Sequence, residues 1–132
     1  MSTSEPGAAP SGFDAWVAVE LGRQGPFTAL VVLVGIGPLT VTPLASTWLH
    51  VVGRELDWRG VAELLDGARV AWDGAVFGPR RGLDGGPLPD AAARITLRDF
   101  GSELIADRSR INGEHFFDRR GRRMKVEEVT AQ

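Results

Sequence analysis

The sequence contains no cysteine, a single lysine (Lys125) and only two histidines, His50 and His115. Without cysteine the chain cannot form disulfides, thiolate metal sites or a thiol nucleophile, and nothing in its cysteine usage requires an oxidising compartment. We therefore expect a cytoplasmic protein. Fourteen arginines beside one lysine are typical of a GC-rich bacterium or its phage. The net charge of −2 gives the chain as a whole no electrostatic attraction to a polyanion.

The length of 132 residues suits one domain with a sizeable core. Residues 1–12 consist of small, polar and proline residues, which bury too little apolar surface to offset the entropy of ordering. They also lack a basic segment followed directly by an apolar core, so we expect no secretory export. The predicted organisation is a disordered segment at 1–12, a single α+β domain at 13–129 and a short tail at 130–132.

No charged side chain occurs between Arg23 and Arg54. Within this stretch, residues 27–34 lack any alternation of polar and apolar side chains, which in a strand indicates burial on both faces of a sheet. The alternative is one membrane span at about 26–52, with the arginine excess after it placing the C-terminal part in the cytoplasm. Four residues within this span argue against a lone helix in lipid, namely Gly35, Gly37, Pro38 and Pro43. We therefore favour buried strands.

Local patterns also assign the elements around this stretch. Strands are predicted at about 15–21, 27–34 and 38–42, separated by Gly-Pro turns. Thr42 and Pro43 can begin a helix, which we expect at about 43–52.

The second half of the chain is predicted to alternate helices and hairpins. Asp57 can cap a helix at about 58–67, and a helical apolar stripe predicts another at about 90–107. Asp73-Gly74 favours a tight hairpin between strands at 69–72 and 75–77. Turns at Asn112-Gly113 and between Asp118 and Gly121 predict a C-terminal meander. Its strands are expected at 109–111, 114–118 and 123–129, so the whole pattern indicates an α+β fold with antiparallel strands.

The segment from Arg108 to Lys125 holds seven basic and two acidic residues. A basic hairpin over 108–125 can bind phosphate backbones, with neighbouring phenylalanines available to stack on bases. The alternative is a solvated turn that faces acidic residues of this chain or of a protein partner. The candidate interaction surface comprises Arg108, Arg110, Phe116, Phe117, Arg119, Arg120, Arg122, Arg123 and Lys125.

A second candidate is a small polar site at the same hairpin. Asn112, His115 and Asp118 supply groups that can bind a hard cation or transfer a proton. However, Glu114 and His115 point to opposite faces of a strand, and turn stabilisation explains Asn112 and Asp118 without any chemistry.

The long loop at 78–89 adds two arginines, Arg80 and Arg81, as candidates to join the basic patch. His50 is expected to be a satisfied or edge-exposed histidine of the apolar stretch and not a catalyst. An enzyme acting through the His115 hairpin or the 82–86 loop is a further possibility, but these residues identify no reaction class.

These patterns predict a non-catalytic interaction or structural protein, without cofactor or metal, that self-associates or binds a protein partner. Four tryptophans and two adjacent phenylalanines exceed what so short a chain needs for its core, and aromatic side chains with arginine are favoured at interfaces. The two alternatives are a membrane-anchored accessory subunit with one span at 26–52 and a nucleic-acid-binding protein that uses the 108–125 hairpin.

Overall fold

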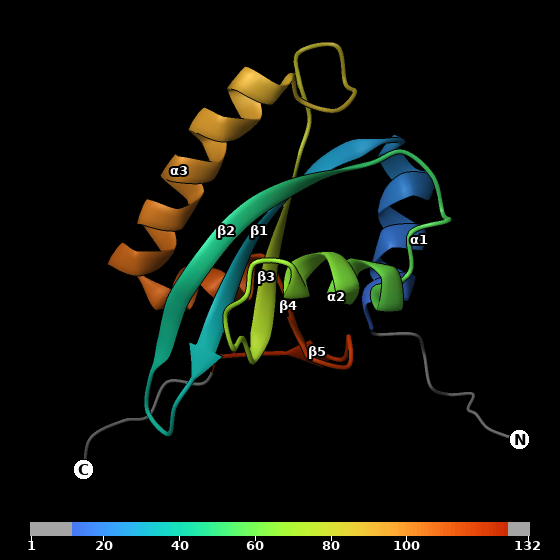
Figure 1. Cartoon of the computed structure of the whole chain (residues 1–132). Coiled ribbons are helices and arrows are strands. Elements are labelled where there is room, and N and C mark those ends of the chain that lie inside the picture. Colours follow the sequence, from blue (N-terminus) through green and yellow to red (C-terminus); the bar gives the residue numbers. More distant parts are fainter. Residues whose placement is uncertain (1–11, 127–132) are drawn as a thin grey trace, which may run out of the picture.

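A computed structural model describes residues 12–126 and shows a central antiparallel sheet with helices on both faces (Figure 1). Helices α1 (Phe13–Gln24) and α2 (Trp58–Asp66) cover one face, while α3 (Asp90–Ala106) and the 3₁₀ helix η1 (Arg108–Gly113) cover the other. The predicted α+β class is therefore confirmed. The strand order is β2-β1-β3-β4-β5, with bounds β1 Phe27–Ile36, β2 Val41–Val51, β3 Gly74–Arg80, β4 His115–Asp118 and β5 Arg123–Met124. Most of the predicted N-terminal segment and the whole predicted tail lie outside the described residues.

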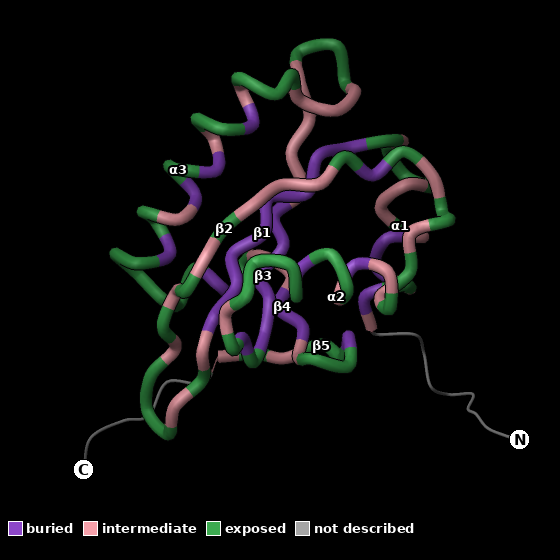
Figure 2. The backbone as a smooth tube through the Cα atoms, in the orientation of Figure 1, coloured by how far each residue is buried: buried purple, intermediate pink, exposed green. Residues whose placement is uncertain are grey.

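Strand β1 lies between β2 and β3 and is buried along nearly its whole length, as Figure 2 shows. Alternate side chains point to opposite faces. Ala29, Val31 and Leu33 pack with α1 and α2, whereas Leu30 and Val32 pack under α3. The prediction of a central strand buried on both faces is confirmed, and this double burial explains why the sequence shows no alternation there.

The strand predicted at 15–21 is wrong, because these residues belong to helix α1. Its buried residues are Phe13, Trp16 and Val17, a spacing of three and four that places all three on one helical face. The short valine-rich run within the helix imitates strand alternation. The apolar stripe becomes visible only when Phe13 is included.

The helix predicted at 43–52 is also wrong, because residues 41–51 form strand β2. The strand pairs with β1 in register from Ile36↔Val41 to Phe27↔Val51, with an irregularity opposite Leu33 and Val34. The strand predicted at 38–42 begins only at Val41. The preceding residues form the hairpin turn, in which the N–H of Gly37 donates to the carbonyl of Thr40 at 2.9 Å. Pairing with a fully buried neighbour thus overrides a weak local helical pattern.

The hairpin predicted at Asp73-Gly74 is absent from the described structure, and residues 69–72 form no strand. Asp73 instead joins β3 to β1: its N–H donates to the carbonyl of Val34 at 2.8 Å. Its carboxylate oxygen Oδ2 accepts the N–H of Ile36 at 2.7 Å. Strand β3 then continues to Arg80, beyond the predicted 75–77. The dipeptide therefore begins a strand that pairs with a distant partner.

The helices predicted at 58–67 and 90–107 are confirmed as α2 and α3 within one residue at each end. Asp57 caps α2, since its carboxylate accepts the N–H of Gly60 at 2.9 Å. In α3, four evenly spaced residues face the sheet, namely Ala93, Leu97, Phe100 and Leu104.

The C-terminal meander is confirmed only in part. Residues 109–111 belong to η1 and not to a strand, because the carboxylate of Asp107 accepts the N–H of Ser109 at 3.1 Å and starts a helical turn. The predicted turn at Asn112-Gly113 is consequently the end of η1. The second turn is confirmed by the N–H of Gly121, which donates to the carbonyl of Asp118 at 3.0 Å. Strand β5 ends at Met124, and residues 127–129 of the predicted strand lie outside the described part.

The membrane alternative required a helix at about 26–52, where the structure places the hairpin of β1 and β2. Within residues 12–126, no helix has the length and apolar character needed to cross a bilayer.

Candidate functional site

The two adjacent phenylalanines of the basic hairpin are both core residues. Phe116 packs under α3, and Phe117 packs on the opposite face with α1 and α2. Neither ring is exposed to stack on a base or to anchor a partner. Trp16 and Trp72 are buried in the core as well, and Trp58 packs against it. The aromatic residues thus fill the core, and Trp48 of β2 is half-buried against the other core cluster.

Arg119 forms a compact contact with α2 and the segment after it. Its guanidinium donates to Asp66 Oδ1 at 2.8 Å, and its Cζ lies 4.0 Å from the centroid of the Trp72 ring. The hydrogen bond from Arg119 lowers the pKa of Asp66, and a second one from the Trp72 indole acts in the same direction. This arginine lies against the protein surface, with 49% of its side chain exposed.

Two more arginines of the hairpin are engaged within the chain. The Nε of Arg122 donates to Asp118 Oδ2 at 2.8 Å. Arg123 lies with its Cζ 4.9 Å from the centroid of the Phe117 ring. Burial alone would raise the pKa of Asp118, but the N–H groups of Arg122 and Arg120 and the Arg122 side chain lower it overall.

Arg120 is exposed at the same turn, and the other three basic residues of the predicted surface lie outside it. Arg108 donates from Nε to the carbonyl of Val41 at 2.6 Å, and Arg110 pairs loosely with Glu103 at 3.7 Å. Lys125 is exposed beyond β5. The structure therefore keeps Arg119, Arg120, Arg122 and Arg123 together at the β4–β5 turn, where all four are exposed, and engages three of them in contacts within the chain.

The two loop arginines are anchored away from the hairpin tip. Arg81 pairs with Glu20 of α1 at 2.7 Å, with only 14% and 15% of the two side chains exposed. It also donates to the carbonyl of Gly25 at 2.6 Å. Arg80 pairs with Glu114 at 3.2 Å. Both residues fix the end of β3 to its surroundings.

Asn112, His115 and Asp118 do not converge on one point. Asn112 forms two hydrogen bonds with the backbone of Val126, at 2.7 and 2.8 Å, in the manner of a strand partner. The His115 ring stacks on Trp16 with centroids 4.4 Å apart. Its burial, aided by the charge of Arg123, lowers the pKa of His115 to about 4, against an opposing effect of Glu20. Within the described ranges, no group of three His, Cys, Asp or Glu residues is arranged to hold a metal ion.

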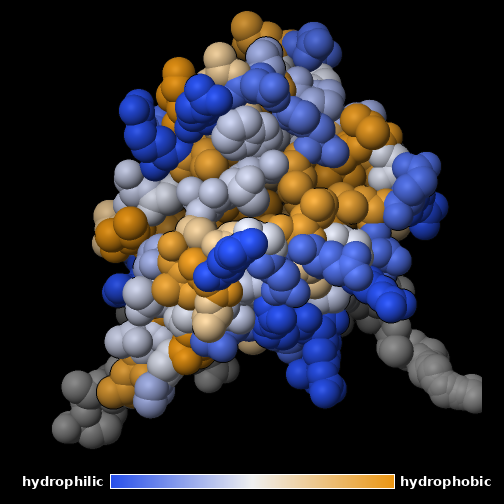
Figure 3. Space-filling view, in the orientation of Figure 1, coloured by the Kyte–Doolittle hydropathy of each residue, from blue (hydrophilic) through white to orange (hydrophobic). Residues whose placement is uncertain are grey.

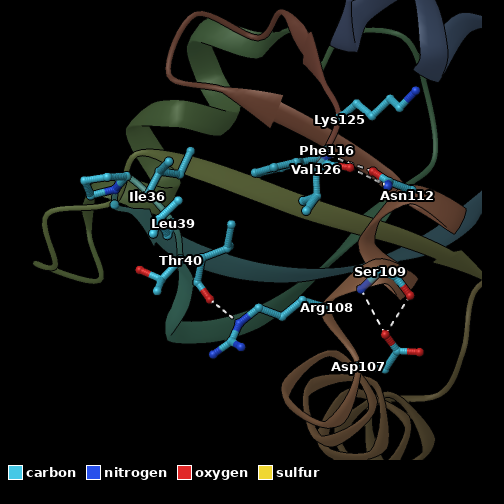
Figure 4. A pocket seen from close by; sticks show the side chains of 13 residues that line it. Ile36, Leu39, Thr40, Asp107, Arg108, Ser109, Asn112, Phe116, Lys125 and Val126 are labelled. Carbon is cyan, nitrogen blue, oxygen red and sulfur yellow. Dashed lines mark hydrogen bonds between the residues drawn. The ribbon is translucent and has the colours of Figure 1, made fainter. Parts of the chain in front are cut away.

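A groove of ≈ 960 Å³ lies between the β1–β2 turn and η1 (Figure 4). Its apolar lining includes Ile36, Leu39 and Phe116. Figure 4 shows its two cationic side chains, Arg108 and Lys125, pointing in opposite directions. The groove therefore offers no concentrated charge for an anionic ligand.

A polar network that sequence reasoning missed joins β1, β2 and α3. The hydroxyl of Thr28, fully buried, accepts the N–H of Leu88 at 2.8 Å and lies 2.9 Å from His50 Nδ1. His50 Nε2 lies 2.9 Å from Asp90 Oδ1. The Asp90 carboxylate can only accept, so Nε2 donates to it; the other nitrogen of the neutral ring, Nδ1, is then an acceptor, and the Thr28 hydroxyl donates to it.

This order of hydroxyl, imidazole and carboxylate is the order of a nucleophilic triad. Thr28, however, has no surface that a substrate can reach, and its hydroxyl is occupied by Leu88. The network instead fastens the 81–89 loop and the start of α3 to the sheet. The hydrogen bond from His50, with a smaller one from Trp48, lowers the pKa of Asp90. A threonine inside an otherwise apolar run was the one sequence signal for it.

The outer edge of β2 is the second feature that sequence reasoning missed. In an antiparallel sheet the backbone groups of successive residues point alternately to the two neighbouring strands. Asp73, at the start of β3, bonds the backbone groups of Val34 and Ile36. Even-numbered residues of β1 therefore direct their backbone groups toward β3, and odd-numbered residues direct theirs toward β2.

The register with β1 then fixes which groups of β2 face outward. Odd-numbered Leu33, Val31 and Ala29 pair with Ala45, Thr47 and Leu49. The residues between these partners direct their N–H and C=O groups away from the sheet: they are Ser46, Trp48 and His50. None of the described residues hydrogen-bonds those backbone groups. In Figure 1 no other element crosses in front of β2.

Comparison of the chain with models of known protein families, with curated proteins and with solved structures reveals no match.

Proposed function

We propose that this protein is a non-catalytic interaction or assembly component that associates with a second copy of itself through the outer edge of β2. The observation that carries the proposal is a strand of 11 residues that is paired on one side only and contains no Asp, Glu, Lys or Arg. Unpaired strand edges attract further strands, and proteins ordinarily protect them with charges, prolines, bulges or a covering element.

Protection is present on β2, but only at its first end. Pro43 lies opposite Val34, and the register changes beside it, which leaves Leu44 as the extra residue of a bulge. Since Val34 is even-numbered, the missing N–H of Pro43 faces outward, where proline is tolerated at an edge. Both devices discourage pairing at residues 41–45. The stretch from Ser46 to His50 has neither.

The side chains around this stretch also suit an interface. Figure 3, which views the molecule from the β2 side, shows hydrophobic and neutral side chains along the course of β2, with hydrophilic ones on either side. Interfaces commonly combine such an apolar centre with a polar rim. We place this assembly in the cytoplasm of a GC-rich bacterium or its phage, on the basis of the cysteine-free and arginine-rich composition.

Sedimentation velocity and light scattering of the purified chain test the proposal. We expect a dimer, with twice the mass of the 14.2 kDa chain. Ser46→Lys places a charge on the exposed edge and should weaken dimerisation by about tenfold or more. The matched control is Val19→Lys, which adds the same charge at an exposed position of α1 and should leave the dimer intact. A wild-type chain that stays monomeric at all attainable concentrations overturns the proposal.

A further inference from the structure

We infer that the two copies pair their β2 strands antiparallel about a two-fold axis at Trp48, so that the two sheets join into one continuous sheet. This inference rests on the proposed function and specifies its interface: the partner is a second copy of this chain, and the register is fixed.

The outward backbone groups select this register. Ser46, Trp48 and His50 are the residues of the unprotected stretch that direct N–H and C=O groups outward. An axis at Trp48 pairs Ser46 with His50 of the second copy, Trp48 with its equivalent, and His50 with Ser46. Each such pair exchanges two backbone hydrogen bonds. An axis at residue 47 or 49 leaves one of the three residues in each copy without a partner.

Side chains at the axis favour the same arrangement. Trp48 is half-buried and packs beside the core cluster under α3, so the axis brings two indoles side by side on one face of the joined sheet. Cross-strand aromatic pairs of this kind stabilise antiparallel sheets. On the other face, the half-buried Thr47 comes opposite Leu49 of the second copy.

The charges of α3 are complementary about the same axis. Asp90 contacts His50 at 2.9 Å, and one turn later the Cζ of Arg94 lies 5.9 Å from the centroid of the Trp48 ring. Four helical residues advance about 6 Å, close to the roughly 6.7 Å of two strand residues. Arg98, one further turn along, is therefore level with Ser46.

Because the axis relates position 46 to position 50, it brings Asp90 of each copy level with Arg98 of the other. Asp90 and Arg98 are both exposed. The interface thus contains two equivalent pairs of opposite charge. Arg94 lies near the axis, over the Trp48 ring of its own copy.

Disulfide trapping measures the register directly, because the natural sequence contains no cysteine. Chains carrying Ser46→Cys and chains carrying His50→Cys are mixed and oxidised. We expect a disulfide between the two kinds of chain, since the paired Cα atoms of antiparallel strands lie within disulfide reach. Either variant alone should give no disulfide, because the equivalent residues of the two copies are four positions apart, roughly 13 Å.

A charge exchange tests the register without substituting a residue of β2; Asp90→Arg also removes the hydrogen bond to His50, so the comparison between the single and double variants carries the test. Asp90→Arg and Arg98→Asp should each weaken dimerisation by about tenfold, while the double variant should restore the wild-type dissociation constant to within about threefold. Asp99→Arg, a matched change on another side of α3, should have no effect.

The possible results of these experiments distinguish an error in the register from an error in the proposed function. A monomer in sedimentation overturns both. A stable dimer in which Ser46→Cys chains crosslink to themselves, or in which the double charge variant is weaker than both single ones, overturns the register alone. Crosslinking of the mixed chains only, together with recovery in the double variant, supports it.

Discussion

The indole ring of Trp58 lies directly against Gly121: a Cβ added to this glycine would come within 2.6 Å of the indole Cγ. The indole Nε1 donates to the carbonyl of Arg119 at 2.8 Å. The carbonyl of Gly121 in turn accepts the N–H of Phe13 at the start of α1, at 2.9 Å. The turn between β4 and β5 is therefore fastened to the first turns of both α1 and α2. This attachment holds Arg119 beside Asp66 and Trp72.

We expect Gly121→Ala to lower the free energy of unfolding by about 2 kcal/mol or more. Gly121 has a φ of 77°, a region that costs a residue with a side chain about 1 kcal/mol or more, and the new methyl group would also displace Trp58. Urea unfolding followed by tryptophan fluorescence measures the change. The matched control is Gly113→Ala, since nothing lies within 4 Å of a Cβ there. Equal stability of the two variants would contradict the described contact.

His115 should make the protein less stable in mild acid. Burial, and the charge of Arg123 second, hold the pKa of His115 at about 4 in the folded chain, below the ordinary value of about 6.5. Between these values the unfolded chain binds a proton that the folded chain does not, so stability falls as pH decreases from about 6.5 to 4. The ring is only partly buried, and solvent screening reduces the effect to roughly 1–2 kcal/mol.

The variant His115→Phe keeps a ring against Trp16 and removes the titrating group. As the pH falls, the free energy of unfolding should therefore decrease more for the wild-type protein than for the variant. Titration of the His115 ring by NMR measures the same property directly. An NMR titration midpoint near the ordinary histidine pKa of about 6.5 would contradict the burial of the His115 ring.

The central strand β1 and the helices α2 and α3 were predictable because their patterns are local and strong. Residues 27–34 combine β-branched and apolar side chains without alternation, and Asp57 marks the start of α2 with a cap that the structure contains. Residues 43–52 were not predictable in this way. Their helical spacing is weak, and the pairing with β1 that makes them a strand is a tertiary interaction.

The candidate sites were less predictable than the fold, because they depend on residues far apart in sequence. His50 meets Thr28 and Asp90, which are 22 and 40 positions away. The basic hairpin had a clear signal in its charge. Its acidic partner Asp66, which is 53 positions away from Arg119, had none. The outward direction of Ser46, Trp48 and His50 likewise follows from the register and not from residue types.

Removing one member of the buried ion pair between Arg81 and Glu20 should destabilise the fold more than removing both. The variant Arg81→Met leaves the Glu20 carboxylate, only 15% exposed, without its partner, and removes a donor from the carbonyl of Gly25. We expect it to lower the free energy of unfolding by about 3 kcal/mol. The double variant Arg81→Met/Glu20→Met should recover most of that loss, because two apolar side chains of similar length replace the desolvated charges.

Arg122→Met is the matched control: its ion pair with Asp118 leaves 69% of the arginine side chain exposed, and the expected change is below about 1 kcal/mol. Denaturant unfolding of wild type, Arg81→Met, Glu20→Met and the double variant completes the cycle, and additive losses from the two single variants would show that the two side chains do not act as a pair.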